Sequence, residues 1–221
     1  MASEVDICNI ALGHLGDEAA ISAIAPPDGS VQAAHCARIY PMARDELLEM
    51  HNWRFAVKRK ALALLATTEQ PQEWAYTYGY PTCIRVIAIR PANEPTTSNS
   101  NLIFDEQEFL AAPKTYPFTV EALDDGTQVI YTNVEDATVH YVAAITDVAK
   151  FSPLFRAALA RLMAHYLAGP IVKGKVGIEV ARTQLELFEK IASPRAKASD
   201  ANARRDTSYD NFVPSSLAAR R

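Results

Sequence analysis

The chain contains little cysteine, with three residues among 221, and it has no long apolar run. An odd number of cysteines leaves no complete pairing, so we expect buried free thiols in a reducing compartment. No stretch of about 18 apolar residues occurs, so no membrane-spanning helix is expected. The first residues are acidic and lack the basic and apolar regions of a secretory signal, so none is expected. The cysteines are Cys8, Cys36 and Cys83.

Motifs for catalysis or metal binding are lacking as well. No Gly-x-Ser-x-Gly nucleophile elbow occurs. The five histidines form no His-x-x-x-His pair and have no Cys-x-x-Cys nearby, whereas a zinc site needs about four convergent ligands. On its apolar helix, His165 is interpreted as a packed core residue, and His140 is placed on the outer face of a strand. The sequence therefore predicts no catalytic, cofactor-binding or metal-binding residue.

Two local patterns come close to functional motifs. Residues 169–176 have the glycine and lysine spacing of a phosphate-binding loop, but Val176 stands where that loop needs a hydroxyl for Mg²⁺. A helix precedes this segment, so a connection between two helices is favoured. His35 and Cys36 are adjacent, but neighbours on a helix point about 100° apart. A Cys–His dyad is therefore disfavoured.

Charge is distributed unevenly along the chain. The formal net charge is −4. From Ser193 onward there are six basic and three acidic residues, which gives +3 there and leaves −7 for the rest. A body of that sign should bind nucleic acid weakly, because phosphate neutralisation needs clustered lysine and arginine.

Apolar residues at helical spacing predict four helices. Ser3 can cap the first, and Gly16 suits its C-terminal end. A kink or break is expected at Pro41 in the second helix. Gly169-Pro170 is expected to end the third helix and Pro194 the fourth. The predicted helices lie near residues 3–15, 31–50, 153–167 and 175–192.

The middle of the chain is expected to be rich in β-structure. Residues 82–90 read as a strand because β-branched residues are dense there. A hairpin turn is indicated at Asp124-Asp125-Gly126, and alternation from Val139 to Ile145 predicts the last strand. Residues 53–70 give a mixed signal. The predicted fold is α+β and mainly α: about four helices, with a small antiparallel β-sheet insertion at about 80–146 in a domain of residues 1–192.

Residues 193–221 are predicted to be an extended C-terminal tail, because they hold too few apolar groups to fold alone. Four apolar side chains in this tail are candidate anchors for a partner surface. They are Tyr209, Phe212, Val213 and Leu217.

Aromatic residues are concentrated between positions 53 and 80. Stacking on nucleic-acid bases is one interpretation of this set. Few basic residues interleave with its second half, so packing in the core and against other subunits is favoured. The set comprises Trp53, Phe55, Trp74, Tyr76, Tyr78 and Tyr80.

These residues occur in an order that resembles the tail tubular protein A family, the head-to-tail adaptors of short-tailed phages and related viruses. The resemblance spans most of residues 5–192. Its anchors are Asn9, Leu12, Leu15-Gly16, Ile21, Ala33, Ala34, Cys36, Tyr40, Arg44 to Leu48, Trp53, Phe55-Ala56, Trp74 to Tyr76, Tyr80-Pro81, Cys83 to Val86, Tyr141 to Ala143, Asp147, Phe151 and Pro153 to Phe155.

The resemblance implies a structural virion protein rather than an enzyme. It implies a ring, usually of twelve copies, stacked between the portal protein and the tail nozzle or next tail component. DNA would cross the lumen without specific binding, and an acidic wall would let it slide. The protein would be assembled in the host cytoplasm and reside at the head–tail interface of the virion. No cofactor or membrane is implied.

The tail residues Tyr209, Phe212, Val213 and Leu217 are the candidate portal contacts. They would become ordered on binding and fill apolar pockets. Deleting residues 195–221 is accordingly expected to abolish docking while the core stays folded.

Two other functions are compatible with the sequence. A tail-associated cell-wall (peptidoglycan) hydrolase would need a carboxylate pair in a cleft, for which Glu46 and Glu49 are candidates. Two solvated charges on one helix face are the favoured interpretation of that pair. A nucleic-acid-binding module would use the basic tail, and its affinity would fall steeply with salt.

Overall fold

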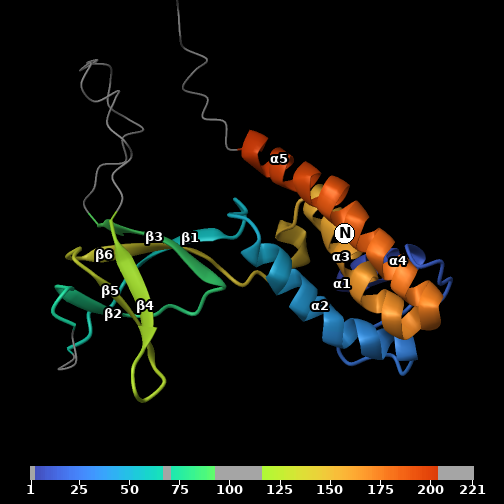
Figure 1. Cartoon of the computed structure of the whole chain (residues 1–221), viewed down its shortest axis with the longest axis horizontal. Coiled ribbons are helices and arrows are strands. Elements are labelled where there is room, and N and C mark those ends of the chain that lie inside the picture. Colours follow the sequence, from blue (N-terminus) through green and yellow to red (C-terminus); the bar gives the residue numbers. More distant parts are fainter. Residues whose placement is uncertain (1–2, 67–70, 93–115, 204–221) are drawn as a thin grey trace, which may run out of the picture. The chain divides into compact units, whose positions relative to one another are not determined.

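The computed structural model describes residues 3–66, 71–92 and 116–203. The chain divides into two compact units. The helical unit comprises residues 1–44 and 147–221, and the sheet unit comprises residues 45–146. Figure 1 shows helices in the first and two small antiparallel sheets in the second, so the α+β, mainly α prediction is confirmed.

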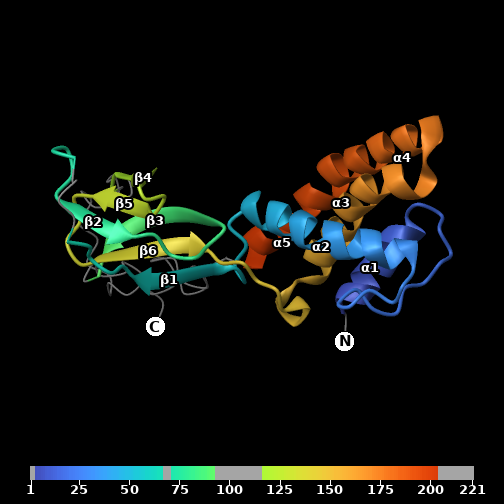
Figure 2. The same ribbon diagram turned by 90° about the horizontal axis from the view of Figure 1, so that it is seen from below.

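The helical unit is organised around one buried helix, α3 (Pro153–Val172), against which α1, α4 and α5 pack. Its side chains from Phe155 to Ala168 include nine that are buried, and they surround the helix rather than form one stripe. Figure 2 shows this unit from a second direction. The other elements are α1 (Glu4–Gly13), α2 (Val31–Glu49), the 3₁₀ turn η2 (Val148–Lys150), α4 (Gly174–Leu187), the π-helical segment η3 (Phe188–Ala192) and α5 (Ser193–Ala203). The end of α2, from Asp45, belongs to the sheet unit.

The helix starts follow the capping residues in the sequence. The Ser3 hydroxyl accepts from the Asp6 amide, and the Asp6 carboxylate accepts from the Ser3 amide, which completes a capping box. Gly16, after α1, has φ 75°, a backbone conformation that glycine adopts freely. Ser152 accepts from the Phe155 amide at 3.2 Å and starts α3.

In the described helices, the chain stays helical at Pro41, Pro170 and Pro194, so the predicted helix ends at Gly169-Pro170 and Pro194 are wrong. The helix α2 continues through Pro41 without a break, and α3 continues past Pro170 to Val172. At Pro194 the preceding segment is π-helical, and the Ser193 amide donates to the Phe188 carbonyl five residues back. This wider turn accommodates a residue that has no amide hydrogen. Residues 193–203 are therefore helix, not extended tail.

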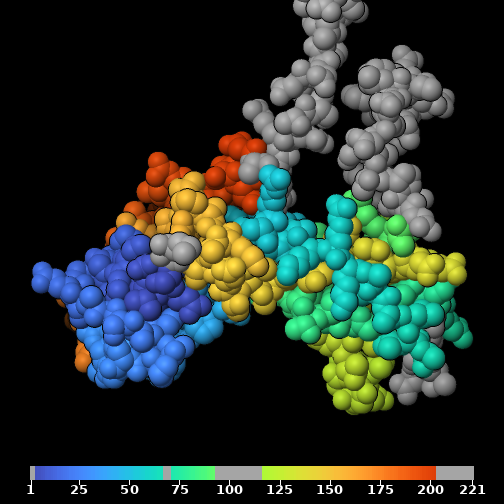
Figure 3. All heavy atoms as spheres, turned by 180° about the vertical axis from the view of Figure 1, so that it is seen from behind, coloured from blue at the N-terminus to red at the C-terminus, as the bar shows by residue number. Residues whose placement is uncertain are grey.

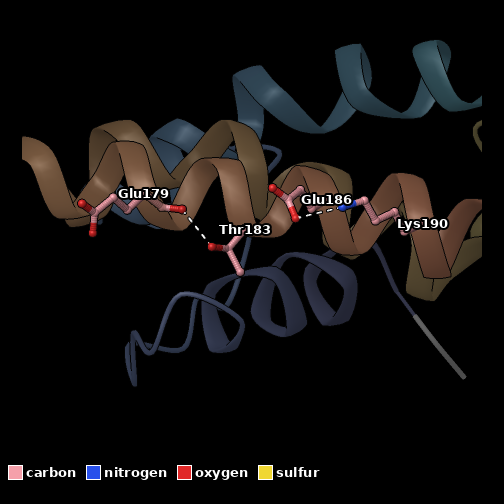
Figure 4. A network of polar contacts seen from close by, with 4 residues as sticks. All are labelled: Glu179, Thr183, Glu186 and Lys190. Atoms are coloured by element: carbon pink, nitrogen blue, oxygen red, sulfur yellow. Dashed lines mark hydrogen bonds and ion pairs between the residues drawn. The ribbon is translucent and has the colours of Figure 1, made fainter.

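The exposed side of α4 and η3 carries polar contacts, together with the exposed apolar side chains Val176 and Ile178 in the first turns of α4. Thr183 donates to the Glu179 carbonyl oxygen at 3.0 Å, and Lys190 pairs with the Glu186 carboxylate at 3.2 Å (Figure 4). Both partners of the ion pair are exposed, so its contribution to stability is small. Among the described residues, no helix is both long and apolar enough to cross a membrane.

The sheet unit contains two three-stranded antiparallel sheets, with orders β1-β6-β3 and β2-β5-β4. The predicted strand at 82–90, the hairpin turn and the last strand are present. The insertion begins earlier than residue 80, because β1 and β2 precede it. The strands are β1 (Val57–Ala61), β2 (Tyr76–Gly79), β3 (Arg85–Pro91), β4 (Phe118–Ala122), β5 (Gln128–Thr132) and β6 (Ala137–Val142).

Aromatic residues hold the sheet unit together, which confirms the core-packing interpretation for Trp53 and Tyr78. The Trp53 ring is fully buried, and its indole nitrogen donates to the Leu47 carbonyl at 2.7 Å. The Tyr78 hydroxyl donates to the Val134 carbonyl at 2.9 Å and accepts from the Ala137 amide at 3.4 Å. Both polar groups are thereby satisfied while the rings contribute apolar burial.

Candidate functional site

Of the adjacent His35 and Cys36, only the cysteine is used for packing. Cys36 of α2 is fully buried, and its side chain is hydrogen-bonded to Cys8 of α1. That hydrogen bond, together with burial, raises the pKa of Cys8, so its thiol stays protonated. The His35 ring lies 2.9 Å from the Arg38 guanidinium. The structure thus pairs each member of the adjacent His–Cys with a different neighbour.

The Glu46 and Glu49 pair lies in the last turn of α2. The Glu49 backbone carbonyl accepts from Arg85 at 3.1 Å, and Arg85 also donates to the Asn52 side chain. Arg85 therefore ties the end of this helix to β3. Within the described ranges, no group of three or more His, Cys, Asp or Glu side chains could hold a metal ion.

The glycine-rich segment at 169–176 joins two helices, as predicted. It includes the end of α3, Lys173 with φ 61° and the start of α4. Gly177, just after this segment, lies close to α3, because an added Cβ would be 3.0 Å from the Ala168 carbonyl oxygen. The segment's own glycines, Gly169 and Gly174, have nothing within 4 Å of an added Cβ, and Gly174 has φ 60°, so the spacing corresponds to a turn between two helices.

A pocket of about 260 Å³ opens on the helical unit, and we call it the arginine pocket. Leu154 and Ile191, on its wall, are 40% and 46% exposed, so the pocket has an apolar rim. Its lining consists of His14, Leu154, Ala157, Arg161, Leu187, Ile191, Ala192 and Arg195.

A buried glutamine positions the pocket's first arginine. Arg161 of α3 donates to the Gln184 side-chain oxygen at 2.8 Å, and the Gln184 amide donates to the His14 carbonyl at 3.0 Å. Gln184 is 6% exposed, so this polar bridge links α1, α3 and α4 inside the unit. Sequence analysis missed the bridge, since a lone glutamine in a helix gives no signal of its partners.

The electrostatics of the arginine pocket favour an anionic occupant. Burial, and then the charge of Arg161, lower the pKa of His14, so its ring is neutral at pH 7. Two guanidinium groups remain as cations, and no carboxylate lines the pocket. A partner group that combines an apolar part with a carboxylate would pack against the apolar rim and bind the arginines.

A second feature lies on the β1-β6-β3 sheet. These three strands contain five basic residues and no acidic one. Figure 2 shows β6 between β1 and β3, and Figure 3 shows the chain segment around β1, in cyan, at the molecular surface. Arg59 pairs directly with His140, and Arg90 pairs with Thr138.

Paired residues of antiparallel strands point to the same face, and so do residues two apart in one strand. Arg59, Arg90, His140 and Thr138 therefore share one face, which we call the basic sheet face. Both arginines are exposed. Burial, followed by the charges of Arg59 and Arg90, lowers the pKa of His140. The prediction that His140 lies on the outer face of a strand is confirmed.

The candidate portal contacts Tyr209, Phe212, Val213 and Leu217 lie outside the described residues. Ser193 and Ala196, which the sequence assigned to the same tail, are buried in the helical unit. No protein-family model matches the chain, and no curated protein matches it.

Proposed function

We propose that this protein is a head-to-tail adaptor of a virus, a structural ring component between the portal and the next tail component. The observation that supports it best is the structural role of the residues that carry the resemblance. The Asn9 side chain donates to the Ile21 carbonyl at 3.1 Å and accepts from the Ile21 amide at 2.9 Å. Asn9 and Ile21 thus work together to close the turn after α1.

Further anchors act at points where the chain changes direction. The Asp147 side chain accepts from the Ala149 amide and starts η2, just before α3. The Phe151 and Phe155 rings contact each other at a tilt of 50°, with centroids 4.8 Å apart, and are 3% and 0% exposed. The anchor residues described here stabilise turns, helix starts and buried contacts. This role is the one expected in a protein that functions by assembly.

The proposed mechanism is sequential docking. Copies of the chain would join on the portal after DNA packaging, and the ring would create the surface for the next tail component. The arginine pocket would bind a group of a partner protein that combines an apolar part with a carboxylate. The segment after Ala203 holds the candidate portal contacts and directly follows α5.

Cosedimentation with the portal ring tests this proposal. The deletion that isolates the tail removes residues 204–221, because a cut at 195 would also remove Ala196, which is fully buried. The full chain should cosediment with the portal, and the shortened chain should lose that property while keeping its circular dichroism spectrum. Failure of the full, folded chain to associate with the portal would overturn the adaptor proposal.

The hydrolase alternative has a separate test. It requires two carboxylates across a cleft, and none lines the arginine pocket. A zymogram with the purified chain should show no clearing. Clearing that disappears on a Glu→Gln substitution would replace the adaptor proposal with the hydrolase.

A further inference from the structure

We propose that the basic sheet face binds the phosphate backbone of duplex DNA. The inference deepens the proposed adaptor function, and it rests on that function for bringing DNA to the protein. Its structural basis is independent: one sheet in an otherwise acidic chain carries five basic residues and no acidic one. Two of them, Arg59 and Arg90, point to the same face from strands on either side of β6.

The spacing of these arginines suits a polyanion. They are separated by two inter-strand steps and by two residues along the strands, so their Cα atoms are roughly 12 Å apart. Because arginine side chains are long, the two guanidinium groups can lie closer together or farther apart than the Cα atoms. A DNA duplex carries one negative charge about every 1.7 Å along its axis, so both groups can contact phosphates together.

The cations of this sheet have few competing partners. Within the described parts of the chain, no ion pair or hydrogen bond joins Arg59 or Arg90 to an acidic side chain. Lys58 and Lys60 flank Arg59 on the same exposed edge strand. Arg85 differs, because it is held by the Glu49 carbonyl and Asn52. Lys58 and Lys60 alternate with Arg59 and so point to the opposite face of the sheet. The two arginines of the basic sheet face are therefore the cations available to an incoming anion.

The uncharged residues of the face favour DNA over an acidic protein. Protein interfaces take most of their affinity from buried aromatic and large apolar anchors. Between the two arginines lie His140, Thr138 and the small residues Ala61 and Ala88. Phosphate contacts need cations and hydrogen-bond donors but no apolar anchor.

Binding of this kind is independent of base sequence and weak for a single copy. Non-specific dissociation constants lie at about 10⁻⁴ to 10⁻⁶ M at physiological salt. A ring would present the face many times, and each contact could exchange as DNA moves. The proposal therefore replaces the expected uniformly acidic channel wall with a wall on which a local basic face contacts DNA.

Fluorescence anisotropy tests the proposal, with a labelled 30-base-pair duplex titrated by the full chain at several salt concentrations. The variant Arg59→Gln/Arg90→Gln is compared with a control, Lys175→Gln/Arg182→Gln, which removes the same charge from exposed positions of α4. The first variant should bind about tenfold more weakly at low salt, and its log–log salt slope should be shallower by about 2. The control should resemble the wild type.

Three outcomes would overturn the proposal: unchanged binding by the Arg59→Gln/Arg90→Gln variant, an equal loss in the control, or tighter arginine-dependent binding of poly-glutamate than of DNA at matched charge. The last would identify an acidic protein as the partner. Cosedimentation with the portal provides an independent readout, since this variant should dock like the wild type. Loss of DNA binding with docking intact therefore leaves the adaptor proposal standing.

Discussion

At the scale of single residues, a few polar side chains fix the chain between helices. Asn9 forms both hydrogen bonds to the Ile21 backbone from the middle of α1, twelve residues away. Gln184 links Arg161 to the His14 carbonyl across three helices. Each satisfies a backbone group that would otherwise lose its partner away from water.

Replacing Asn9 with alanine should lower the free energy of unfolding by about 1 to 3 kcal/mol, because both Ile21 backbone groups lose their partner. Urea denaturation followed by circular dichroism measures this change. The control is Gln32→Ala, which removes one hydrogen bond to Asp17 at 3.2 Å and should stay within about 0.5 kcal/mol. Equal effects of the two substitutions would contradict the assigned role of Asn9.

Two histidines make stability depend on pH. Burial is the main reason that the pKa values of His14 and His140 lie below the unfolded value of about 6.5. The unfolded state therefore binds more protons as pH falls through 6.5, and folding stability should decrease from pH 7 to pH 5. The pKa values of Asp6, Asp28 and Asp125 are also lowered, but these carboxylates change stability only at lower pH, where they become protonated.

The measurement is the urea midpoint at pH 7 and pH 5. The wild type should have the lower midpoint at pH 5, and His14→Gln/His140→Gln should reduce the difference. A difference of the same size in that variant would show that other groups cause the pH dependence.

At the scale of secondary structure elements, the contact between α3 and α4 depends on one glycine. Gly177→Ala should destabilise the protein by about 1 kcal/mol, because the new methyl group would press on the Ala168 carbonyl. Gly13→Ala, in α1 with nothing within 4 Å of the added atom, should stabilise by about 0.5 to 1 kcal/mol. Thermal melts should shift in opposite directions, and shifts of the same sign would contradict this packing.

The elements also show how far the sequence predicts the structure. The two ends of α1 could be predicted, because the cap at Ser3 and the turn at Gly16 depend only on neighbouring residues. The helix that continues through Pro194 could not be predicted, because a π-helical turn before it and the buried Ala196 after it depend on tertiary packing. Helix propensity predicts helix ends poorly where tertiary packing offsets it.

The strand β1 shows the same limit. Its sequence, Val57 to Ala61, has three consecutive cations and no apolar alternation, so nothing in it indicates a strand. Its pairing with β6, some 80 residues later, supplies the hydrogen bonds. The basic sheet face could not be recognised without that register, although each of its charges is visible in the sequence.

At the scale of the whole molecule, two features of the described residues bring arginines together. The arginine pocket belongs to the helical unit, and the basic sheet face belongs to the sheet unit. We assign the pocket to a protein partner and the face to DNA, because the pocket has apolar walls and the face has small and polar ones. An adaptor needs both kinds of contact.

Electron microscopy of the full chain mixed with the portal ring of its virus tests the central claim most directly. The adaptor proposal predicts a second ring stacked coaxially on the portal, with an open channel continuous through both. Portal rings that remain bare beside folded protein would contradict it.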